Sequence, residues 1–263
     1  GVKIAGTDAT NIKQWLVDTT SATYPYKNPT AAVNKLTVSS NDIILADNFD
    51  LNDLCWAVDT QGNPTSMTIH KQDGSTQTTN YTDAANITAL QLDTVDTSVT
   101  EIKNNFLRGC TGLSGKLDLS FLSNITKIDD HFLQGCSTIN ELDLTPLANV
   151  KTIGNYFLND CTALATVNFN VLSNLTSIGG YFLSGCTTLP ASLSFSNLNK
   201  VTKIGARFLQ NCTTITSVDL SGFVNVTEIG YYFLRGCTSL LNIDMSNMIS
   251  LGKVDEGFLW GIG

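Results

Sequence analysis

A Phe-Leu pair recurs at a nearly fixed interval in the second half of this 263-residue chain, and this period constrains the fold more than any other feature. The pairs begin at seven positions, which are Phe106, Phe132, Phe157, Phe182, Phe208, Phe233 and Phe258. The steps between them are 26, 25, 25, 26, 25 and 25 residues. Repeats of this length are the signature of a solenoid, in which each coil covers the apolar side of its neighbour.

A second apolar pattern lies between the Phe-Leu pairs, as in Ile139-x-x-Leu142-x-Leu144. Its last two apolar residues alternate with a polar one, which predicts a short strand with one buried face. We expect one parallel strand per repeat, within the ranges 87–92, 114–119, 139–144, 164–169, 190–195, 215–220 and 240–245. Two repeats carry one extra residue before the strand, after Leu113 and Leu189, and a local bulge would absorb it.

The Phe-Leu segment is expected to form one or two helical turns on the other side of each coil. The residue before each Cys is always Gly, Asn or Asp, the types that tolerate positive φ, so it is expected to end the short helix. These residues are Gly109, Gly135, Asp160, Gly185, Asn211 and Gly236. The predicted fold is thus an α/β solenoid, a right-handed stack with one short parallel strand and one helical turn per repeat.

Residues 84–263 are expected to form this solenoid, with about seven repeats. Residues 1–83 lack the repeat and are interpreted as an N-terminal cap or small α+β domain that covers the open end of the stack. The elements expected there are a helix over 8–17, strands at 35–38 and 43–45, a helical turn within 51–58, and a hairpin of 67–71 with 76–81 around Asp73-Gly74.

Charge and hydropathy exclude several classes of function. The net charge is −8 with only 15 basic residues, which argues against nucleic-acid binding and against a polybasic membrane-surface role. No run approaches 18 apolar residues, so direct membrane insertion is not expected. The chain starts at Gly1 without the features of a signal peptide, which leaves open whether one was removed.

Six of the seven cysteines share one repeat position, and they are Cys110, Cys136, Cys161, Cys186, Cys212 and Cys237. Stacked coils would place them about 5 Å apart with parallel rather than facing side chains, a poor geometry for disulfides. We therefore expect buried free thiols that act as small hydrophobes. A zinc site would need close pairs such as C-x-x-C, which are absent, and no cofactor is expected.

The residue between the two buried positions of each strand is expected to point out of the sheet. We call these residues the strand column: Gln91, Asp118, Asp143, Asn168, Ser194, Asp219 and Asp244. Carboxylates on neighbouring coils would lie about 5 Å apart, and could recruit Ca²⁺ or a basic partner. The alternative is that each Asp is solvated or bonds a nearby hydroxyl or amide.

A second outward row is expected just before each Phe. This turn column comprises Asn105, His131, Tyr156, Tyr181, Arg207, Tyr232 and Gly257. Beside it stands an adjacent column of Arg108, Gln134, Asn159, Ser184, Gln210, Arg235 and Trp260. Tyr and Arg on a rigid surface are typical interface anchors, so the candidates here are Tyr156, Tyr181, Tyr232, Arg207 and Arg235. The alternative is that the rings only cover the Phe core.

Enzyme chemistry has little support in the sequence, so a non-enzyme is expected. The two histidines, His70 and His131, have no Ser or Cys nucleophile spaced to match them. Three of the six N-x-Thr sequons, at Asn124, Asn174 and Asn225, share a repeat position, so the repeat explains them without glycosylation.

The repeat Ile-Gly-x-x-Phe-Leu-x-x-Cys, as at 153–161, resembles the BspA-like branch of leucine-rich repeat proteins over about residues 84–263. That family has Ile-Gly-x-x-Ala-Phe-x-x-Cys at the same spacing; here Phe replaces the Ala and Leu replaces the Phe. Its members are mostly surface or secreted proteins of bacteria and of some mucosal protists, and some resemble adhesins that bind host matrix proteins. The resemblance implies a cell-surface or secreted location and a protein partner.

The expected function is therefore a surface-exposed or secreted protein-binding module of adhesin-like type, with a host extracellular-matrix protein as one candidate partner. The alternative is a structural spacer, surface-layer or stalk component that presents another domain.

Overall fold

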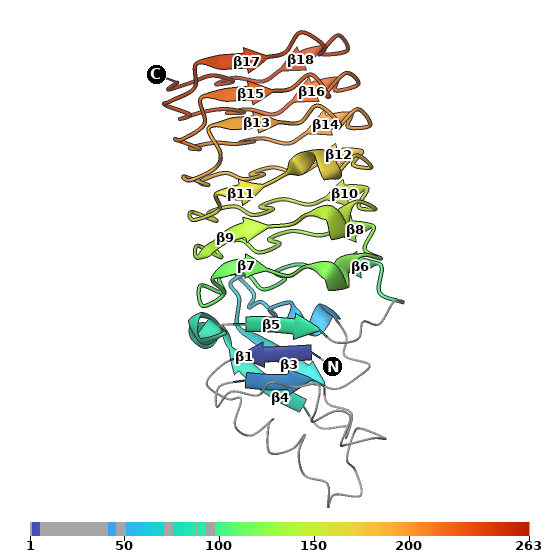
Figure 1. Cartoon of the computed structure of the whole chain (residues 1–263), viewed down its shortest axis with the longest axis vertical. Coiled ribbons are helices and arrows are strands. Elements are labelled where there is room, and N and C mark those ends of the chain that lie inside the picture. The colour runs from blue at the N-terminus through green and yellow to red at the C-terminus, as the bar shows by residue number, and fades with distance from the viewer. Residues whose placement is uncertain are drawn as a thin grey trace, which may run out of the picture.

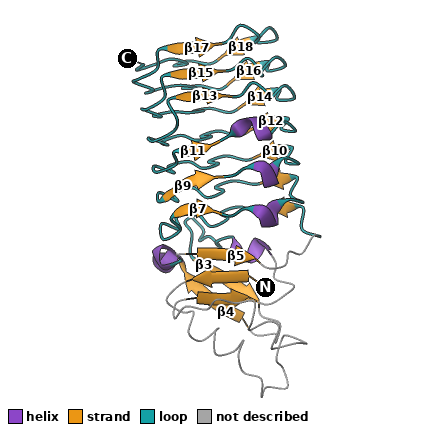
Figure 2. Cartoon of the chain, in the orientation of Figure 1, coloured by secondary structure: helices purple, strands orange, loops and turns teal. Residues whose placement is uncertain are grey.

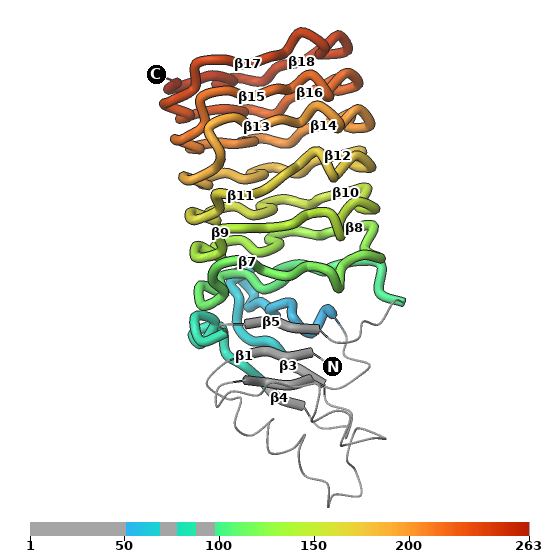
Figure 3. Tube along the Cα trace, in the orientation of Figure 1, coloured from blue at the N-terminus to red at the C-terminus, as the bar shows by residue number. Residues whose placement is uncertain are grey.

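The structure is a computed structural model that describes residues 2–5, 42–45, 51–70, 76–87, 89–92 and 98–262. Within these ranges the chain forms a stack of coils that rises from an N-terminal region, with the C-terminus at the far end (Figure 1). The tube in Figure 3 shows each coil lying directly on the one before it. The helix expected over 8–17 and the strand expected at 35–38 lie outside the described residues.

One side of the stack is a seven-stranded parallel sheet to which every coil contributes two residues. Its strands, in spatial and chain order, are β6 (Glu101–Ile102), β8 (Lys127–Ile128), β10 (Thr152–Ile153), β12 (Ser177–Ile178), β14 (Lys203–Ile204), β16 (Glu228–Ile229) and β18 (Lys253–Val254). The second residue pairs with its repeat equivalent in the next coil, as Ile153 does with Ile178. The Ile that precedes the Phe-Leu pair in the repeat thus lies in a second strand of the coil. This strand is separate from the one predicted by the apolar-x-x-apolar-x-apolar pattern.

The other side carries the strands expected from the apolar-x-x-apolar-x-apolar pattern. They are β7 (Gly115–Leu117), β9 (Ile139–Leu142), β11 (Thr166–Val167), β13 (Ser192–Ser194), β15 (Ser217–Asp219) and β17 (Asn242–Asp244). They pair in parallel within two three-stranded sheets, β7-β9-β11 and β13-β15-β17. The predicted parallel solenoid is confirmed, but each coil has two short strands, not one.

The two longer repeats interrupt this second side in different ways. The register between β7 and β9 shifts at Gly115 and Lys116, but the residue left unpaired is Asn140 of β9, so this bulge does not lie in the longer repeat as expected. The extra residue of the later repeat lies beside Pro190, between β11 and β13, where the sheet divides. Proline has no N–H to donate to a ladder, which suits it to this break.

The Phe-Leu segment does not form the expected helix; Figure 2 draws it as loop. Its φ values alternate in sign, with Tyr156 at 61°, Leu158 at 53° and Asp160 at 58°. Each of these three N–H groups donates to another coil: Tyr156 to the Gly180 carbonyl and Leu158 to that of Phe132. Asp160 donates to Ser184. These bonds offset the cost of left-handed conformations in non-glycine residues. As expected, the residue before each Cys has positive φ.

The helical turns occur elsewhere in the repeat. They are the 3₁₀ turns η3 (Ser120–Leu122), η4 (Thr145–Leu147) and η5 (Phe169–Val171), which directly follow the strands β7, β9 and β11. The repeat therefore contains a helical turn, but in the first three coils it lies after the strand and not at the Phe-Leu pair.

In four coils a Gly follows the buried Ile and allows the backbones of neighbouring coils to approach closely; these are Gly154, Gly179, Gly205 and Gly230. A Cβ added to Gly205 would lie 2.4 Å from the backbone N of Gly180 and 2.6 Å from the carbonyl carbon of Gly179. Any side chain here would force backbone of two coils apart. In these coils the Gly is therefore needed for the close approach of the two backbones.

One continuous core fills the inside of the stack with columns of Phe, Leu, Ile and Cys. The Phe rings stack from coil to coil, with Phe157, Phe182 and Phe208 separated by 5.3 Å between centroids at each step. The six cysteines of the repeat are buried and free, as expected. Their Sγ–H groups are also used: Cys186 donates to the Leu158 carbonyl of the preceding coil at 3.1 Å.

The N-terminal region contains two small antiparallel sheets. β3 (Ser66–His70) and β4 (Thr76–Asn80) pair as the predicted hairpin, whose turn lies outside the described residues. β1 (Val2–Ala5) pairs on one side with β2 (Asp42–Leu45) and on the other with β5 (Ala89–Leu92). The expectation that 87–92 holds the first strand of the parallel stack is wrong, because β5 runs antiparallel to β1. The boundary between residues 83 and 84 stays a prediction.

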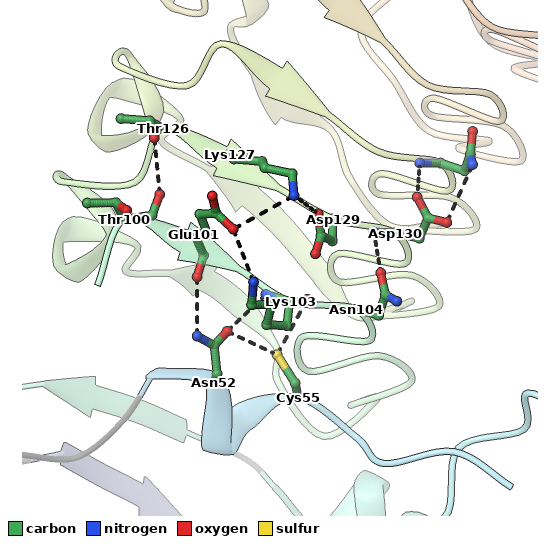
Figure 4. A network of polar contacts seen from close by, with 11 residues as sticks. Asn52, Cys55, Thr100, Glu101, Lys103, Asn104, Thr126, Lys127, Asp129 and Asp130 are labelled. Atoms are coloured by element: carbon green, nitrogen blue, oxygen red, sulfur yellow. Dashed lines mark hydrogen bonds and ion pairs between the residues drawn. The ribbon is translucent and has the colours of Figure 1, made fainter. Parts of the chain in front are cut away.

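The short 3₁₀ turn η1 (Leu51–Leu54) and the residues after it cover the backbone of the first coil. Leu107 donates its N–H to the Leu54 carbonyl at 2.8 Å, and Trp56 donates to the Asn105 carbonyl at 3.2 Å. The side-chain amide of Asn52 bonds to the backbone of the first coil at two points. Its NH2 group donates to the Glu101 carbonyl, and its oxygen accepts the Lys103 N–H. Figure 4 shows this contact beside the ion pairs of Lys127 with Glu101 and Asp129. In most later coils the equivalent N–H groups donate to the preceding coil, as Leu158 does to Phe132, so this region takes the place of a preceding coil. The second 3₁₀ turn of the region is η2 (Tyr81–Asn86).

Candidate functional site

The strand column makes a repeated local hydrogen bond. In each described coil, the side-chain oxygen accepts the backbone N–H two residues later, at 2.8 to 3.3 Å. The pairs are Asp118 with Ser120, Asp143 with Thr145, Asn168 with Asn170, Ser194 with Ser196, Asp219 with Ser221, and Asp244 with Ser246. Asn and Ser perform the same task as Asp, so the column has a structural role that needs no charge. This matches the alternative in which each Asp bonds a nearby hydroxyl or amide.

These bonds also stabilise the carboxylate form. Side-chain and backbone hydrogen bonds from Thr145 lower the pKa of Asp143, and bonds from Ser246 lower that of Asp244. Beside the first two Asp residues of the column, Lys116 forms an ion pair with Glu141 at 2.8 Å. Lys116, Asp118 and Asp143 line a shallow depression of about 320 Å³. No group of three or more His, Cys, Asp or Glu side chains able to hold a metal occurs within the described ranges.

Asp219 gives a direct test of the capping role, since it also accepts the Ser194 hydroxyl at 3.1 Å. We expect Asp219→Ala to lower the free energy of unfolding by about 1 kcal/mol. Asp219→Asn should be nearly neutral, because the amide oxygen keeps the bond from the Ser221 N–H and the amide NH2 group is placed to donate to the Ser194 hydroxyl. Hydrogen bonds, led by that of the Ser221 side chain, lower the folded pKa of Asp219. The stabilisation should therefore be complete at neutral pH and lost as the pH falls below about 4.

Urea titrations of both variants at pH 7 and pH 3 would measure this effect. Equal stability of the Ala and Asn variants at pH 7 would contradict the capping role.

The turn column forms a continuous stack of rings and cations. His131 stacks on Tyr156 with centroids 4.6 Å apart, and Tyr156 stacks on Tyr181 at 4.3 Å. Arg207 then takes the place of a ring, with its Cζ 5.0 Å from the Tyr181 centroid and 5.2 Å from that of Tyr232. All five side chains are half-buried. The rings cover the core edge, as the alternative proposed, and also present edges and hydroxyls at the surface.

Three of the seven members of the adjacent column lie inside the protein, so the expectation that they face outward is wrong for these three. Asn159, Ser184 and Gln210 are only 5%, 6% and 7% exposed. Their polar groups bond between or within coils: the Asn159 amide donates to the Ser184 carbonyl at 2.7 Å, and Gln210 accepts from Arg207 at 3.2 Å. These bonds draw the side chains inward.

The last two members of the adjacent column, Arg235 and Trp260, extend the stack of rings and cations in the turn column. Arg235 lies with its Cζ 4.8 Å from the centroid of Tyr232 and 4.8 Å from that of Trp260. Trp260 is 59% exposed. We call the following set the aromatic row: His131, Tyr156, Tyr181, Arg207, Tyr232, Arg235 and Trp260. The structure thus brings together the five Tyr and Arg candidates from the sequence and separates them from the strand column.

Tyr231 belongs beside this row, although sequence reasoning missed it. Its ring lies 5.7 Å from the Arg207 Cζ and meets Tyr232 edge-on at 5.3 Å. The signal was available, because Tyr231 occupies a repeat position that holds Gly180 and Ala206 in the two preceding coils.

His131 has no catalytic arrangement around it. Its Nδ1 lies 2.6 Å from Gln134 Oε1, and burial lowers the pKa of the imidazole, which favours the neutral ring.

Two of the repeated sequon positions are explained by a ladder of asparagines. Asn174 donates its amide to the Ala148 carbonyl at 2.8 Å, and Asn225 donates to that of Asn199 at 2.7 Å. Asn149 makes the same contact with Ser123 without being part of a sequon. The asparagine is thus used in joining coils, whether or not Thr follows.

The class of protein is a leucine-rich repeat solenoid. It is defined by parallel strands on two sides, by one sequence repeat per coil, and by a core of stacked Phe, Leu and Cys columns. No described helix is both long and apolar enough to span a membrane. Leucine-rich repeat modules typically mediate protein–protein interaction and are typically non-enzymatic, so protein interaction is the general function of this fold.

The sequence matches the family described as BspA type leucine rich repeat region, in six copies, over residues 77–191 and 166–255. The chain belongs to this family. A comparison with curated proteins gives no match.

Among solved structures, the chain is similar to a leucine-rich repeat protein of T. pallidum, with 25% identity and a TM-score of 0.47 over 55% of this chain and 62% of that chain. The chain thus spans less than two thirds of that protein. The functional domain of InlJ from Listeria monocytogenes, described as including a cysteine ladder, has 19% identity and a TM-score of 0.38 over 64% of this chain and 36% of that one. A leucine-rich cell surface protein of Faecalibacterium prausnitzii has 15% identity and a TM-score of 0.25 over 61% and 77%.

Proposed function

We propose that this chain is an adhesin-like protein-binding module of a cell-surface or secreted protein, and that it engages its partner through the aromatic row. The observation that carries the proposal is the unbroken contact of ring and guanidinium groups from His131 to Trp260 on successive coils. Aromatic and arginine side chains contribute most of the binding energy at typical protein interfaces.

Rigidity supports the choice of this row. Tyr156, Tyr181, Arg207 and Tyr232 all have positive φ, between 57° and 62°, and their backbone N–H groups donate to the next coil. Each side chain is further held by contact with its neighbours in the row. A surface that is already ordered loses little conformational entropy on binding, which favours affinity.

The strand column is the weaker candidate. Its Asp side chains each have one oxygen committed to the turn that follows, and uncharged Asn168 and Ser194 occupy the same place. A contiguous binding surface of carboxylates is therefore interrupted in the middle of the stack. The repeated cap explains these residues without a partner.

The location and the partner come from the family. BspA-type repeat proteins are typically surface-associated, and a host extracellular-matrix protein is the partner class that the resemblance implies. Matrix proteins are also practical probes, because they can be immobilised and screened as a panel.

The test compares two variants for binding to immobilised host matrix proteins. One carries Tyr156→Ser, Tyr181→Ser and Tyr232→Ser; the other carries Asn in place of Asp118, Asp143, Asp219 and Asp244. The Asn substitutions preserve the capping bonds, as Asn168 shows, so that variant is a matched control that remains folded. We expect the Tyr variant to lose binding by about tenfold or more and the Asn variant to retain it.

Circular dichroism must first show that both variants keep the fold of the parent. Loss of binding only in the Asn variant would move the site to the strand column. A parent chain that binds no member of the panel would instead favour the spacer or stalk function. That second candidate is supported by the uniform coil-to-coil hydrogen bonds along the whole stack.

A further inference from the structure

Arginine is concentrated at one place in this chain. The sequence contains three arginines, Arg108, Arg207 and Arg235, and all lie at the Phe-Leu turns. Arg207 and Arg235 belong to the aromatic row, on neighbouring coils. We infer that these two residues make the row a binding site for an acidic segment of a partner protein, whose carboxylates pair with the two guanidinium groups. This inference rests on the proposed function and specifies the chemistry of its partner.

The first observation is that neither arginine has a carboxylate counter-ion among the residues that the structure describes. In the described part of the chain, five lysines form ion pairs with carboxylates, and these are Lys103, Lys116, Lys127, Lys203 and Lys253. Neither Arg207 nor Arg235 forms one with any residue of the range 98–262. Asp160 and Glu256 are carried on turns of the same side, yet neither pairs with an arginine. Burial raises the pKa of Asp160, with no contribution from a nearby cation.

The second observation is that both guanidinium groups are held in place. The Arg207 Cζ lies within 5.0 to 5.7 Å of the ring centroids of Tyr181, Tyr231 and Tyr232. Its Nη1 donates to Gln210 at 3.2 Å, while its buried Nε has no partner among the described residues. Arg235 lies between Tyr232 and Trp260. A guanidinium group fixed in this way offers its remaining N–H donors with little loss of entropy.

The third observation is the spacing of the two charges. Arg207 and Arg235 lie 5.2 Å and 4.8 Å from the same Tyr232 ring centroid, so their Cζ atoms are at most about 10 Å apart, the sum of these distances. Alternate side chains of an extended peptide are about 7 Å apart. Two acidic residues of one short segment can therefore reach both arginines at once.

The ring geometry favours a carboxylate over a sugar as the group recognised. Tyr156 stacks on both His131 and Tyr181, and Tyr181 contacts Tyr156 and Arg207, so their faces are already occupied. A sugar that packs on aromatic rings needs a free face. The row instead offers hydroxyl and guanidinium donors, and the guanidinium fork matches the two oxygens of a carboxylate.

The experiment is a selection of peptides from a phage-displayed random 12-residue library on the immobilised chain. We expect the enriched peptides to contain at least two Asp or Glu residues. Synthetic copies should bind the parent chain in fluorescence anisotropy, and binding should weaken as NaCl rises from 0.05 to 0.5 M. The variant Arg207→Gln/Arg235→Gln should bind them about tenfold or more weakly.

Lys151→Gln/Lys200→Gln is the matched control, since it removes the same charge from two exposed lysines that lie outside the row and form no ion pair within residues 98–262. It should bind like the parent. Arg207→Lys/Arg235→Lys tests the fork itself and should lose most of the affinity although the charge is kept. Thermal melts confirm the fold of each variant.

The outcomes separate this inference from the proposed function. Enriched peptides that are neutral or basic, but that lose binding in the Tyr variant, would overturn acidic recognition and leave the aromatic row as the site. Equal binding by the Arg207→Gln/Arg235→Gln variant and the parent would also overturn it. Absence of any enriched peptide would count against both proposals. Binding of a sulfated heparin oligosaccharide in place of acidic peptides would identify the wrong anion class and reject the inference.

Discussion

Raising the pH from 8 to about 10.5 should unfold this protein, because its core contains six thiols that cannot ionise in place. Burial raises the pKa of Cys136 to about 12 and that of Cys237 to about 11, and it raises the pKa of the other four well above the ordinary value. In the unfolded chain a thiol ionises near 8.5. Above that pH the unfolded state binds fewer protons than the folded state, so the free energy of unfolding falls as the pH rises.

The expected size is large because the thiols act together. Each contributes a slope of about 1.4 kcal/mol per pH unit once its unfolded form is ionised, and six give about 8 kcal/mol per pH unit. The whole stability of a typical domain is only about 5–15 kcal/mol. Urea titrations between pH 8 and 10.5, with a reductant present, would measure the slope.

A variant with Cys161→Ala, Cys186→Ala and Cys212→Ala provides the comparison. It should be less stable at pH 7, because three packed sulfur atoms are lost, but its stability should fall only about half as steeply with pH. If the parent and this variant have the same slope above pH 9, the thiols are not responsible for the alkaline sensitivity.

Phe182→Ala should lower the free energy of unfolding by about 3–5 kcal/mol, the usual cost of a large ring lost from a packed core. Phe182 is fully buried and stacks on Phe157 and Phe208, with centroids 5.3 Å away on each side. Phe169 meets its ring edge-on at 5.7 Å. The coils are held at a fixed spacing by backbone bonds, so the cavity cannot collapse.

Chemical denaturation of Phe182→Ala beside Leu241→Ala would test the packing. Leu241 is 79% exposed, so its truncation removes an apolar side chain without opening a cavity and should be nearly neutral. A loss below about 1 kcal/mol for Phe182→Ala would mean that the Phe column is not the structural centre of the stack.

The architecture could be predicted from the sequence because a solenoid repeats the same sequence pattern in each coil. The spacing of Phe106 through Phe258, the strand pattern and the buried Cys position all recur often enough to outweigh local ambiguity. The hairpin around Asp73-Gly74 was predicted from turn chemistry, and its strands are present. The second strand per coil was missed because it is two residues long and has no alternation of its own.

The Phe-Leu turn could not be predicted from residue types. Leu158 and Tyr156 both have positive φ, which such residues rarely adopt, and the bonds that stabilise it come from other coils. Local propensity cannot report a partner 25 residues away. The same limit explains why β5 was assigned to the stack: its apolar pattern fits a parallel strand, and only the N-terminal sheet determines that it pairs antiparallel with β1.

The sequence predicted which residues form the candidate site better than it predicted how their side chains are arranged. Tyr156, Tyr181, Tyr232, Arg207 and Arg235 were recognisable as an unusual outward row. Sequence spacing did not reveal that Arg207 takes the place of a ring in a stack, or that Asn159 and Gln210 turn inward. The four Asp residues were recognisable as a column, but their common role as caps depends on backbone geometry.

The bonds between coils also have a consequence for how the chain folds. The side-chain links of the stack mostly join residues 24 to 29 positions apart, as in Cys186 to Leu158 and Asn174 to Ala148, so most of these links join one coil to an adjacent coil. Order can therefore begin at any adjacent pair of coils and spread in both directions, one coil at a time. Such an array has no single folding nucleus. A weak interface between two coils would limit how far cooperative unfolding extends along the stack. The division between β11 and β13, where one ladder is interrupted, is the interface at which two separately melting blocks would first be seen by hydrogen exchange.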